Sequence, residues 1–207
     1  MQTKIAVALI PSIIATLFLA VTYQHGINEE SASHAIRVTA RISACVFLIV
    51  FATSPNKYFG FFATPIINRY RRQWGIAFAL AHLVHLTAII LKVIYVYGGE
   101  WQQLGTIADL WPGGLIYVFI ILMLITSNNF SVKLLGAKGW KALHKVGLYG
   151  IMVSFLQSFL FNFINAVSNG DINNFAVTAF HGMLSAAILY YWFSRIFIWF
   201  KKKKPAQ

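Results

Sequence analysis

Charged residues are scarce in this 207-residue chain, and acidic residues are the scarcest of them. Only 11% of the residues are charged, 58% are hydrophobic, and five acidic residues stand against 17 lysines and arginines. Such a balance cannot cover a soluble protein of this size with polar surface. Apolar runs of roughly 17 to 25 residues, the length that crosses a hydrocarbon core of about 30 Å, recur along nearly the whole chain. The composition therefore excludes a soluble globular protein and leaves no room for a separate soluble domain.

Cysteine is nearly absent as well. The single Cys45 lies inside an apolar run, which excludes an intramolecular disulfide and a thiolate metal cluster. The chain also lacks a P-loop and a Gly-x-Gly-x-x-Gly turn, so it has no motif that would hold FAD or a nicotinamide cofactor. Any electrons that the protein carries must therefore come from another molecule.

The formal charge of +12 is divided unevenly between alternate loops. One set of loops carries the basic residues Arg69, Arg71, Arg72, Lys133, Lys138, Lys141, Lys145 and Lys201 to Lys204. The other set carries the acidic residues Glu29, Glu30, Glu100, Asp109 and Asp171. This pattern follows the positive-inside rule, so we expect the basic loops and both termini to be cytoplasmic. The cations then face membrane lipid, and nucleic acid is not expected as a partner.

The apolar runs predict an all-α integral membrane bundle with one domain over residues 1–207. The predicted transmembrane helices are residues 5–23, 35–53, 74–97, 110–126, 146–167 and 175–200. The first run follows Lys4 and resembles a secretion signal, but no small-residue cleavage site follows Val21. We therefore count this first run as a transmembrane helix, which brings the total to six.

Ionisable residues inside a membrane span cost about 2.5 kcal/mol or more each, so each of them requires a partner, a cofactor or an escape to the interface. Lys92 and Arg37 are close enough to the outer surface for their side chains to reach it. The residues that remain inside are Arg41, His82, His85 and His181, with His144 at the cytoplasmic start of its span.

Three of these residues share one depth when the helical rise of about 1.5 Å per residue is counted inward from each boundary. His85, His181 and Arg41 all fall about 10 Å below the outer surface. Two neutral imidazoles from different helices can bind a haem iron from both sides, which suits electron transfer rather than oxygen binding. Arg41 would face the propionates, and Arg37 is a further candidate for binding the cofactor. His82 is either an alternative ligand or, as we prefer, a partner of a ligand; each histidine can also serve only as a hydrogen-bonding group between helices.

Two short motifs resemble the ferric reductase-like transmembrane domain family, and in particular its MsrQ branch of b-type haem subunits. The first is the run Arg71-Arg72-Gln73-Trp74-Gly75-Ile76 followed by His85, and the second is Trp140-Lys141-Ala142-Leu143-His144-Lys145. The resemblance covers the third to fifth spans. It implies that His85 is an outer haem ligand and His144 an inner histidine, in the inner membrane of a bacterium.

The sequence departs from the family pattern at two positions. Gln157 occupies the place of a second histidine thirteen residues after His144, and the inner partner near Arg71 is missing. We therefore expect His181 to replace the missing ligand, so that one haem b is bound by His85 and His181. His144 would then face a flavin such as FMN, a quinone head group or a second haem.

The resemblance also implies the reaction partners. Electrons would arrive from a separate cytoplasmic flavin reductase or a quinol donor, and leave to a periplasmic redox acceptor protein or a ferric chelate. One alternative is a quinone-reactive cytochrome b of another superfamily, in which His82 and His144 pair. Another is a haem-free membrane transporter or assembly protein, which the lack of carboxylates inside the predicted spans disfavours.

Overall fold

All the regular structure in the described part of the chain is helical. The structure, a computed structural model, describes residues 2–60, 64–170 and 175–203. Its elements are α1 (Gln2–Tyr23), α2 (Glu29–Phe59), α3 (Thr64–Arg69), α4 (Arg71–Tyr95), the short 3-10 helix η1 (Trp101–Leu104), α5 (Ile107–Ile125), α6 (Asn129–Ser168) and α7 (Phe175–Lys203). The predicted all-α fold is thus confirmed over these ranges. Asp171 and Lys204, which were assigned to loops above, lie outside them.

Five helices are long and apolar enough to cross a membrane. Their spanning segments are Thr3–Tyr23, Glu29–Phe59, Arg71–Tyr95, Asn129–Ser168 and Phe175–Lys202. These segments contain four of the six predicted spans and nearly all of a fifth, residues 74–97, which extends two residues beyond Tyr95. The remaining predicted span, residues 110–126, coincides with the shorter apolar helix Leu110–Ile125 within α5. The chain therefore has the architecture of an integral membrane protein.

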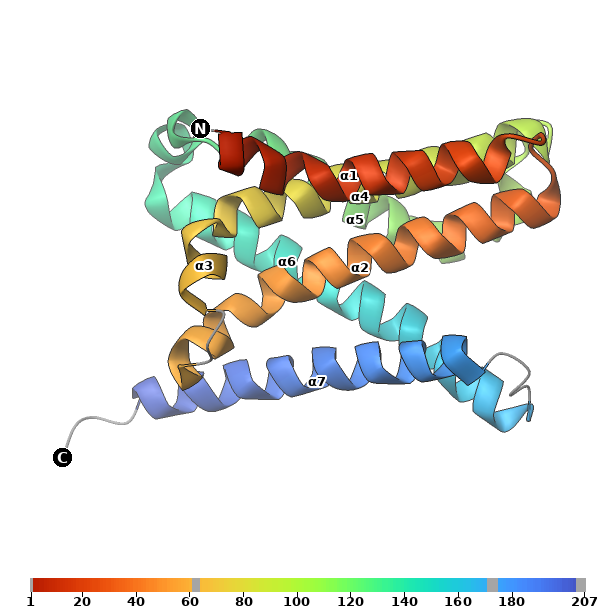
Figure 1. Cartoon of the computed structure of the whole chain (residues 1–207). Coiled ribbons are helices and arrows are strands. Elements are labelled where there is room, and N and C mark those ends of the chain that lie inside the picture. Colours follow the sequence, from red (N-terminus) through yellow and green to blue (C-terminus); the bar gives the residue numbers. More distant parts are fainter. Residues whose placement is uncertain (1, 61–63, 171–174, 204–207) are drawn as a thin grey trace.

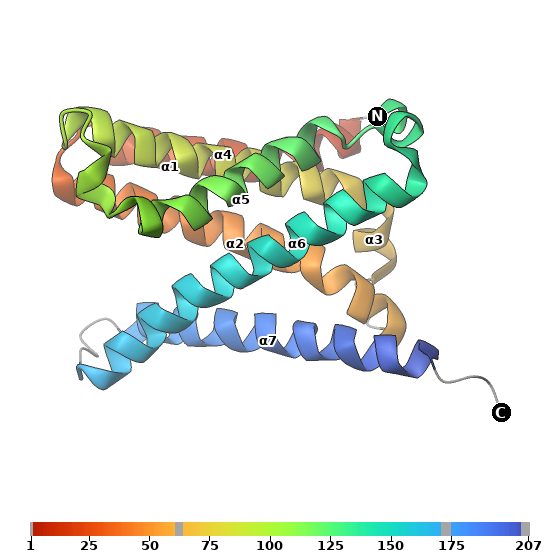
Figure 2. The ribbon, with the colours of Figure 1, turned by 180° about the vertical axis from the view of Figure 1, so that it is seen from behind.

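The bundle has two distinct ends. The N-terminal end of α1, the short helix α3 and the C-terminal end of α7 lie together at one end (Figure 1). The junction between α5 and α6 lies at this same end (Figure 2). The turns from α1 to α2 and from α4 to α5 lie at the opposite end. Each of the long helices, and α5 as well, thus runs from one end of the bundle to the other.

Two helices cross between the layers of the bundle. In both views α2 and α6 run diagonally between the α1–α4 pair and α7 (Figures 1 and 2). α2 packs against α1, α4 and α7, and α6 packs against α5 and α7. Because α7 contacts the rest of the bundle mainly through α2 and α6, these two helices determine where its side chains lie.

Local sequence signals explain where the two crossing helices begin. The Asn28 side chain accepts a hydrogen bond from the Ser31 amide, and the Ser31 side chain closes the reciprocal capping box at the start of α2. Asn128 caps α6 in a similar way through the Ser131 amide. Within α6, Gly136 has φ 69° and ψ 156°, a conformation that essentially only glycine adopts. The helix therefore turns a corner at Gly136 before it enters the bundle.

A cluster of phenylalanine rings from α2, α4 and α6 forms the centre of the core. The Phe47 ring lies 5.5 Å from Phe51, 5.4 Å from Phe78 and 5.3 Å from Phe155, measured between centroids. All four side chains are buried. Lipid is as apolar as these rings, so their close packing stabilises the bundle mainly through dispersion contacts.

Replacing Gly136 should destabilise the fold more than replacing a nearby helical glycine. We expect Gly136→Ala to reduce the free energy of unfolding by about 1–3 kcal/mol, because alanine is strained at this positive φ. Gly139→Ala is the control: a Cβ there meets only the Leu135 Cβ, at an ordinary 3.9 Å. Thermal unfolding of the two variants in the same detergent measures the difference, and equal unfolding temperatures would contradict the corner at Gly136.

Candidate functional site

Two histidines of α4 face α2 inside the bundle. The His82 and His85 rings lie 5.1 Å apart, and only 7% of the His82 surface is exposed. His82 Nδ1 lies 2.9 Å from the Ser43 hydroxyl of α2, and His85 Nδ1 lies 3.1 Å from the Thr39 hydroxyl. Serine and threonine one turn apart on α2 therefore hold two imidazoles that are three residues apart on α4.

These hydroxyl groups also fix where the ring protons lie. The Thr39 hydroxyl donates to the Ala35 carbonyl at 2.7 Å, and the Ser43 hydroxyl donates to the Ala40 carbonyl at 2.9 Å. With these donations, each hydroxyl oxygen is left to accept from the histidine, and on this basis we assign the proton of each neutral ring to Nδ1. The Nε2 atoms of His82 and His85 keep their lone pairs. This is the arrangement in which a second hydrogen bond orients a metal-binding imidazole.

Tyr117 of α5 closes the other side of His82. The two rings stack with a centroid distance of 5.0 Å and an interplanar angle of 30°. The Tyr117 hydroxyl is buried and has no hydrogen-bond partner among the described residues. An unpaired buried hydroxyl costs on the order of 1–3 kcal/mol, which a polar group on a bound molecule would offset.

His181 lies on α7, next to a different group of residues. Its ring is 5.4 Å from Phe159 and 6.2 Å from Phe180. Arg41 of α2 is close enough for its charge to act on His181. Arg41 also lines a shallow, mostly apolar pocket of about 400 Å³ that includes Phe180. Arg37, one turn earlier on α2, is exposed. Phe180 thus links the two residues, since it lies next to His181 and lines the same pocket as Arg41.

His85 and His181, the two expected haem ligands, are not in direct contact. Successive rings connect them: His85 to His82 at 5.1 Å, His82 to Phe155 at 5.4 Å, Phe155 to Phe159 at 6.0 Å, and Phe159 to His181 at 5.4 Å. Within the described residues, the two imidazoles are therefore joined by an unbroken line of side-chain rings that passes through α6.

His144 belongs to a third environment, at the end of the bundle that holds the basic residues. Its ring stacks on Trp140 at a centroid distance of 4.1 Å. Its Nε2 lies 3.1 Å from the Thr126 hydroxyl, which itself donates to the Leu122 carbonyl at 2.6 Å. Here Nε2 therefore donates and Nδ1 keeps the lone pair, the reverse of His82 and His85. The structure does not bring His144 together with His82.

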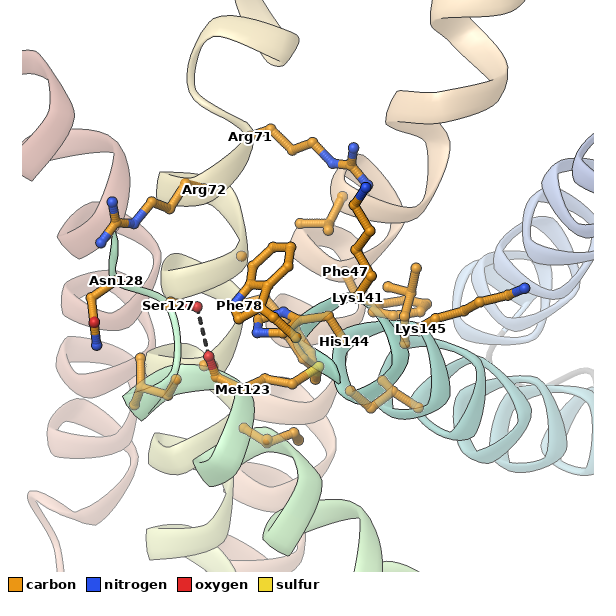
Figure 3. Close-up of a pocket in the computed structure, with 18 of the residues that line it drawn as sticks. Phe47, Arg71, Arg72, Phe78, Met123, Ser127, Asn128, Lys141, His144 and Lys145 are labelled. Atoms are coloured by element: carbon orange, nitrogen blue, oxygen red, sulfur yellow. Dashed lines mark hydrogen bonds between the residues drawn. The ribbon is translucent and has the colours of Figure 1, made fainter. Parts of the chain in front are cut away.

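His144 and Trp140 line a pocket of about 750 Å³ between the helices. Apolar side chains of α2, α4, α5 and α6 form part of its wall, among them Phe47, Phe78 and Ile120. The lining also includes six cations, Arg69, Arg71, Arg72, Lys141, Lys145 and Arg195, and no acidic residue. Figure 3 shows part of this lining around His144.

Arg195 of α7 is a site residue that the sequence reading missed. Its Nε and Nη2 atoms donate to the Phe51 carbonyl of α2 at 3.2 and 2.7 Å, and its guanidinium lies 4.5 Å from the Phe51 ring centroid. The available signal was its charge, because Arg195 falls inside the predicted span 175–200. Thr39, Ser43 and Tyr117 gave no comparable signal.

Gln157 is exposed on α6. The described residues also contain no group of three or more His, Cys, Asp or Glu side chains placed to hold a metal ion.

No protein-family profile matches the sequence, and no solved structure matches the fold. The fold and the site define the class: a helical integral membrane protein with buried histidines in its bundle and a basic pocket at one end.

The hydroxyl partners of the histidines should contribute to stability. We expect Thr39→Val to lower the free energy of unfolding by about 1 kcal/mol, because the buried His85 ring loses its hydrogen bond to the Thr39 hydroxyl. Thr87→Val is the control, since the exposed Thr87 hydroxyl bonds only to the Leu83 carbonyl of its own helix. Unfolding in detergent measures both variants, and an equal loss for Thr87→Val would count against the role of the Thr39–His85 bond.

Proposed function

We propose that this chain is a transmembrane b-type cytochrome that relays single electrons across a bacterial inner membrane. The observation that carries this proposal is the pair of buried imidazoles on α4 whose Nδ1–H groups are bonded to α2, because it leaves Nε2 lone pairs in a dry interior. The sequence motifs around Arg71, His85 and His144 support membership of the ferric reductase-like family.

The proposed topology has six spans with both termini in the cytoplasm. The arrangement in Figure 1 supports it, because the basic residues at the starts of α4 and α6 and at the end of α7 lie at one end of the bundle. Glu29, Glu30 and Glu100 lie at the opposite end, near the turns from α1 to α2 and from α4 to α5. This separation follows the positive-inside rule, and α5 serves as the sixth, shorter span.

The outer half of the bundle could hold a haem only after its side chains rearrange, because neither of the two pockets described above is lined by His85 or His181. His85 would bind iron through Nε2, with Thr39 fixing the orientation of the ring. His181 is the proposed second ligand, and the neighbouring Arg41 would face the propionates, with Arg37 nearer the surface. Phe155 and Phe159 lie along the line of rings between the two imidazoles. A haem held by both histidines would therefore have to displace these two rings.

Haem supplies reversible one-electron exchange when it is bound. The residues of this chain would orient the cofactor, balance its charge and exclude water. The Thr39 hydroxyl keeps the His85 proton on Nδ1, Arg41 supplies positive charge beside His181, and the phenylalanine rings of the core exclude water. His82 lies next to His85 and is best understood as a neighbour that fixes the site, since rings from α4, α5 and α6 enclose it.

The proposed donor is a separate cytoplasmic flavin reductase or a membrane quinol, and the proposed acceptor is a periplasmic redox protein or a ferric chelate. Both assignments rest on the family resemblance and on the absence of a nucleotide-binding motif in the sequence.

A haem-free membrane transporter or assembly protein is the competing function. One observation favours it: His82 and His85 already have hydrogen-bond partners on α2 and could simply join the two helices. The two functions differ in one measurable property, since only the cytochrome carries a pigment.

The spectrum of purified protein tests the proposed function. We expect protein from haem-supplied cells to show the Soret and α bands of a low-spin b-type haem, with one haem per chain by pyridine hemochrome. His85→Ala should abolish the low-spin spectrum, and His181→Ala should convert it to a high-spin form, because each variant removes an axial ligand. His25→Ala, in an exposed turn, should leave the spectrum unchanged.

Two results would reject the proposal at different levels. Colourless protein after expression with sufficient haem would favour the haem-free class. A low-spin spectrum that survives His181→Ala but not His144→Ala would keep the cytochrome and replace the ligand pair.

A further inference from the structure

The basic pocket described above combines an apolar interior with several cations. Its inner wall is apolar, with Phe47, Phe78 and Ile120. Its cations come from separate elements: Arg69 from α3, Arg71 and Arg72 from α4, Lys141 and Lys145 from α6, and Arg195 from α7. The pocket therefore offers a positive rim and an apolar interior to a single bound molecule.

Some of these cations converge although they repel one another. The charges of Arg71 and Arg195 are close enough to interact, and Figure 3 shows Arg71 and Lys141 extending toward one another. Lys145 points away from them in this view. None of the lining residues is acidic, and Glu29, Glu30 and Glu100 lie at the other end of the bundle. Like charges that converge without a carboxylate are stabilised by a bound anion.

Escape to the membrane surface does not explain Arg195. This residue lies six positions before Lys201, about 9 Å deeper along α7, and the Phe51 carbonyl holds its guanidinium in place. Two of its five N–H groups make these bonds and Tyr149 is a further hydrogen-bond partner, so two N–H groups remain for a ligand. The protein thus holds a fixed positive group inside the pocket rather than a mobile one at its surface.

The chemistry of the lining selects the ligand. A small inorganic anion would leave the apolar wall without a contact, and an uncharged quinone would leave the cations without one. A pocket of about 750 Å³ has room for a headgroup and the start of its hydrocarbon chains. Basic pockets between transmembrane helices on the cytoplasmic side are known to hold anionic lipid headgroups.

We propose that this pocket binds one anionic phospholipid. The phosphate lies among Arg71, Lys141 and Arg195, and the glycerol and upper acyl carbons lie against Phe47 and Phe78. This assignment does not depend on electron transfer, because neither His85 nor His181 lines the pocket, and it holds equally for a haem-free protein.

Two double variants test the proposal with the same change in net charge. Arg71→Gln with Lys141→Gln removes two pocket cations, whereas Lys133→Gln with Lys138→Gln removes two exposed cations of α6 that do not line the pocket. Full-length protein in detergent is titrated with phosphatidylglycerol or phosphatidylcholine, and bound lipid is counted by native mass spectrometry. We expect phosphatidylglycerol to bind about tenfold or more weakly to the pocket variant, with little change in the control variant.

A third variant leaves every charge in place. Gly75 lines the pocket, and a Cβ added there meets no atom within 4 Å, so Gly75→Leu fills space that the lipid would occupy. Gly114→Leu is its control, because Gly114 is also helical with open space around it and does not line the pocket. Only Gly75→Leu should weaken phosphatidylglycerol binding, with both variants retaining the helix content of the unchanged protein by circular dichroism.

Specific outcomes overturn the proposal. Equal weakening of phosphatidylglycerol binding by the two double variants would show that only general surface charge matters. Unchanged lipid binding in Gly75→Leu would place the lipid outside the pocket. Displacement of phosphatidylglycerol by millimolar inorganic phosphate or FMN would identify a soluble phosphate compound, rather than a lipid, as the ligand.

Discussion

A polar group of this bundle that lies in the hydrocarbon layer is costly unless it finds a partner within the protein, because lipid offers none. Helix α2 satisfies much of this requirement. Its Thr39 and Ser43 hydroxyls accept from histidines of α4, and its Phe51 carbonyl accepts from Arg195 of α7. These bonds orient the groups that give the bundle its chemistry, so the position of α2 between its neighbours determines what the interior can bind.

The sequence predicted the existence of the helices better than their limits. Apolar length identified six runs, since a hydrocarbon core sets a minimum for a spanning helix. The observed helices extend beyond the predicted spans. The second run was placed at residues 35–53, whereas α2 begins at Glu29, where Asn28 and Ser31 form a capping box. The fifth was placed at residues 146–167, whereas α6 begins at Asn129 and turns its corner at Gly136.

The sequence likewise predicted only part of the candidate site. Counting residues along each helix estimates depth, and the structure does place Arg41 near His181. Depth says nothing about the direction in which a side chain leaves its helix, which depends on helix rotation and crossing. The line of rings through Phe155 and Phe159 was therefore not predictable, nor was the exposure of Gln157 on the same helix. Arg195 was detectable as an intramembrane charge, but its partner lies 144 residues away in the sequence.

The Phe51 carbonyl is free to accept from Arg195 because of a proline. Pro55 lies inside α2, four residues after Phe51, and proline has no N–H to complete the helical hydrogen bond to the Phe51 carbonyl. The guanidinium of Arg195 supplies the missing donors from another helix. The Phe51 carbonyl lacks its helical donor and the Arg195 guanidinium needs an acceptor inside the bundle, so each group provides the partner that the other needs. This contact fixes the position of α7 along the axis of α2, so a missing hydrogen bond in one helix helps to align the neighbouring helix.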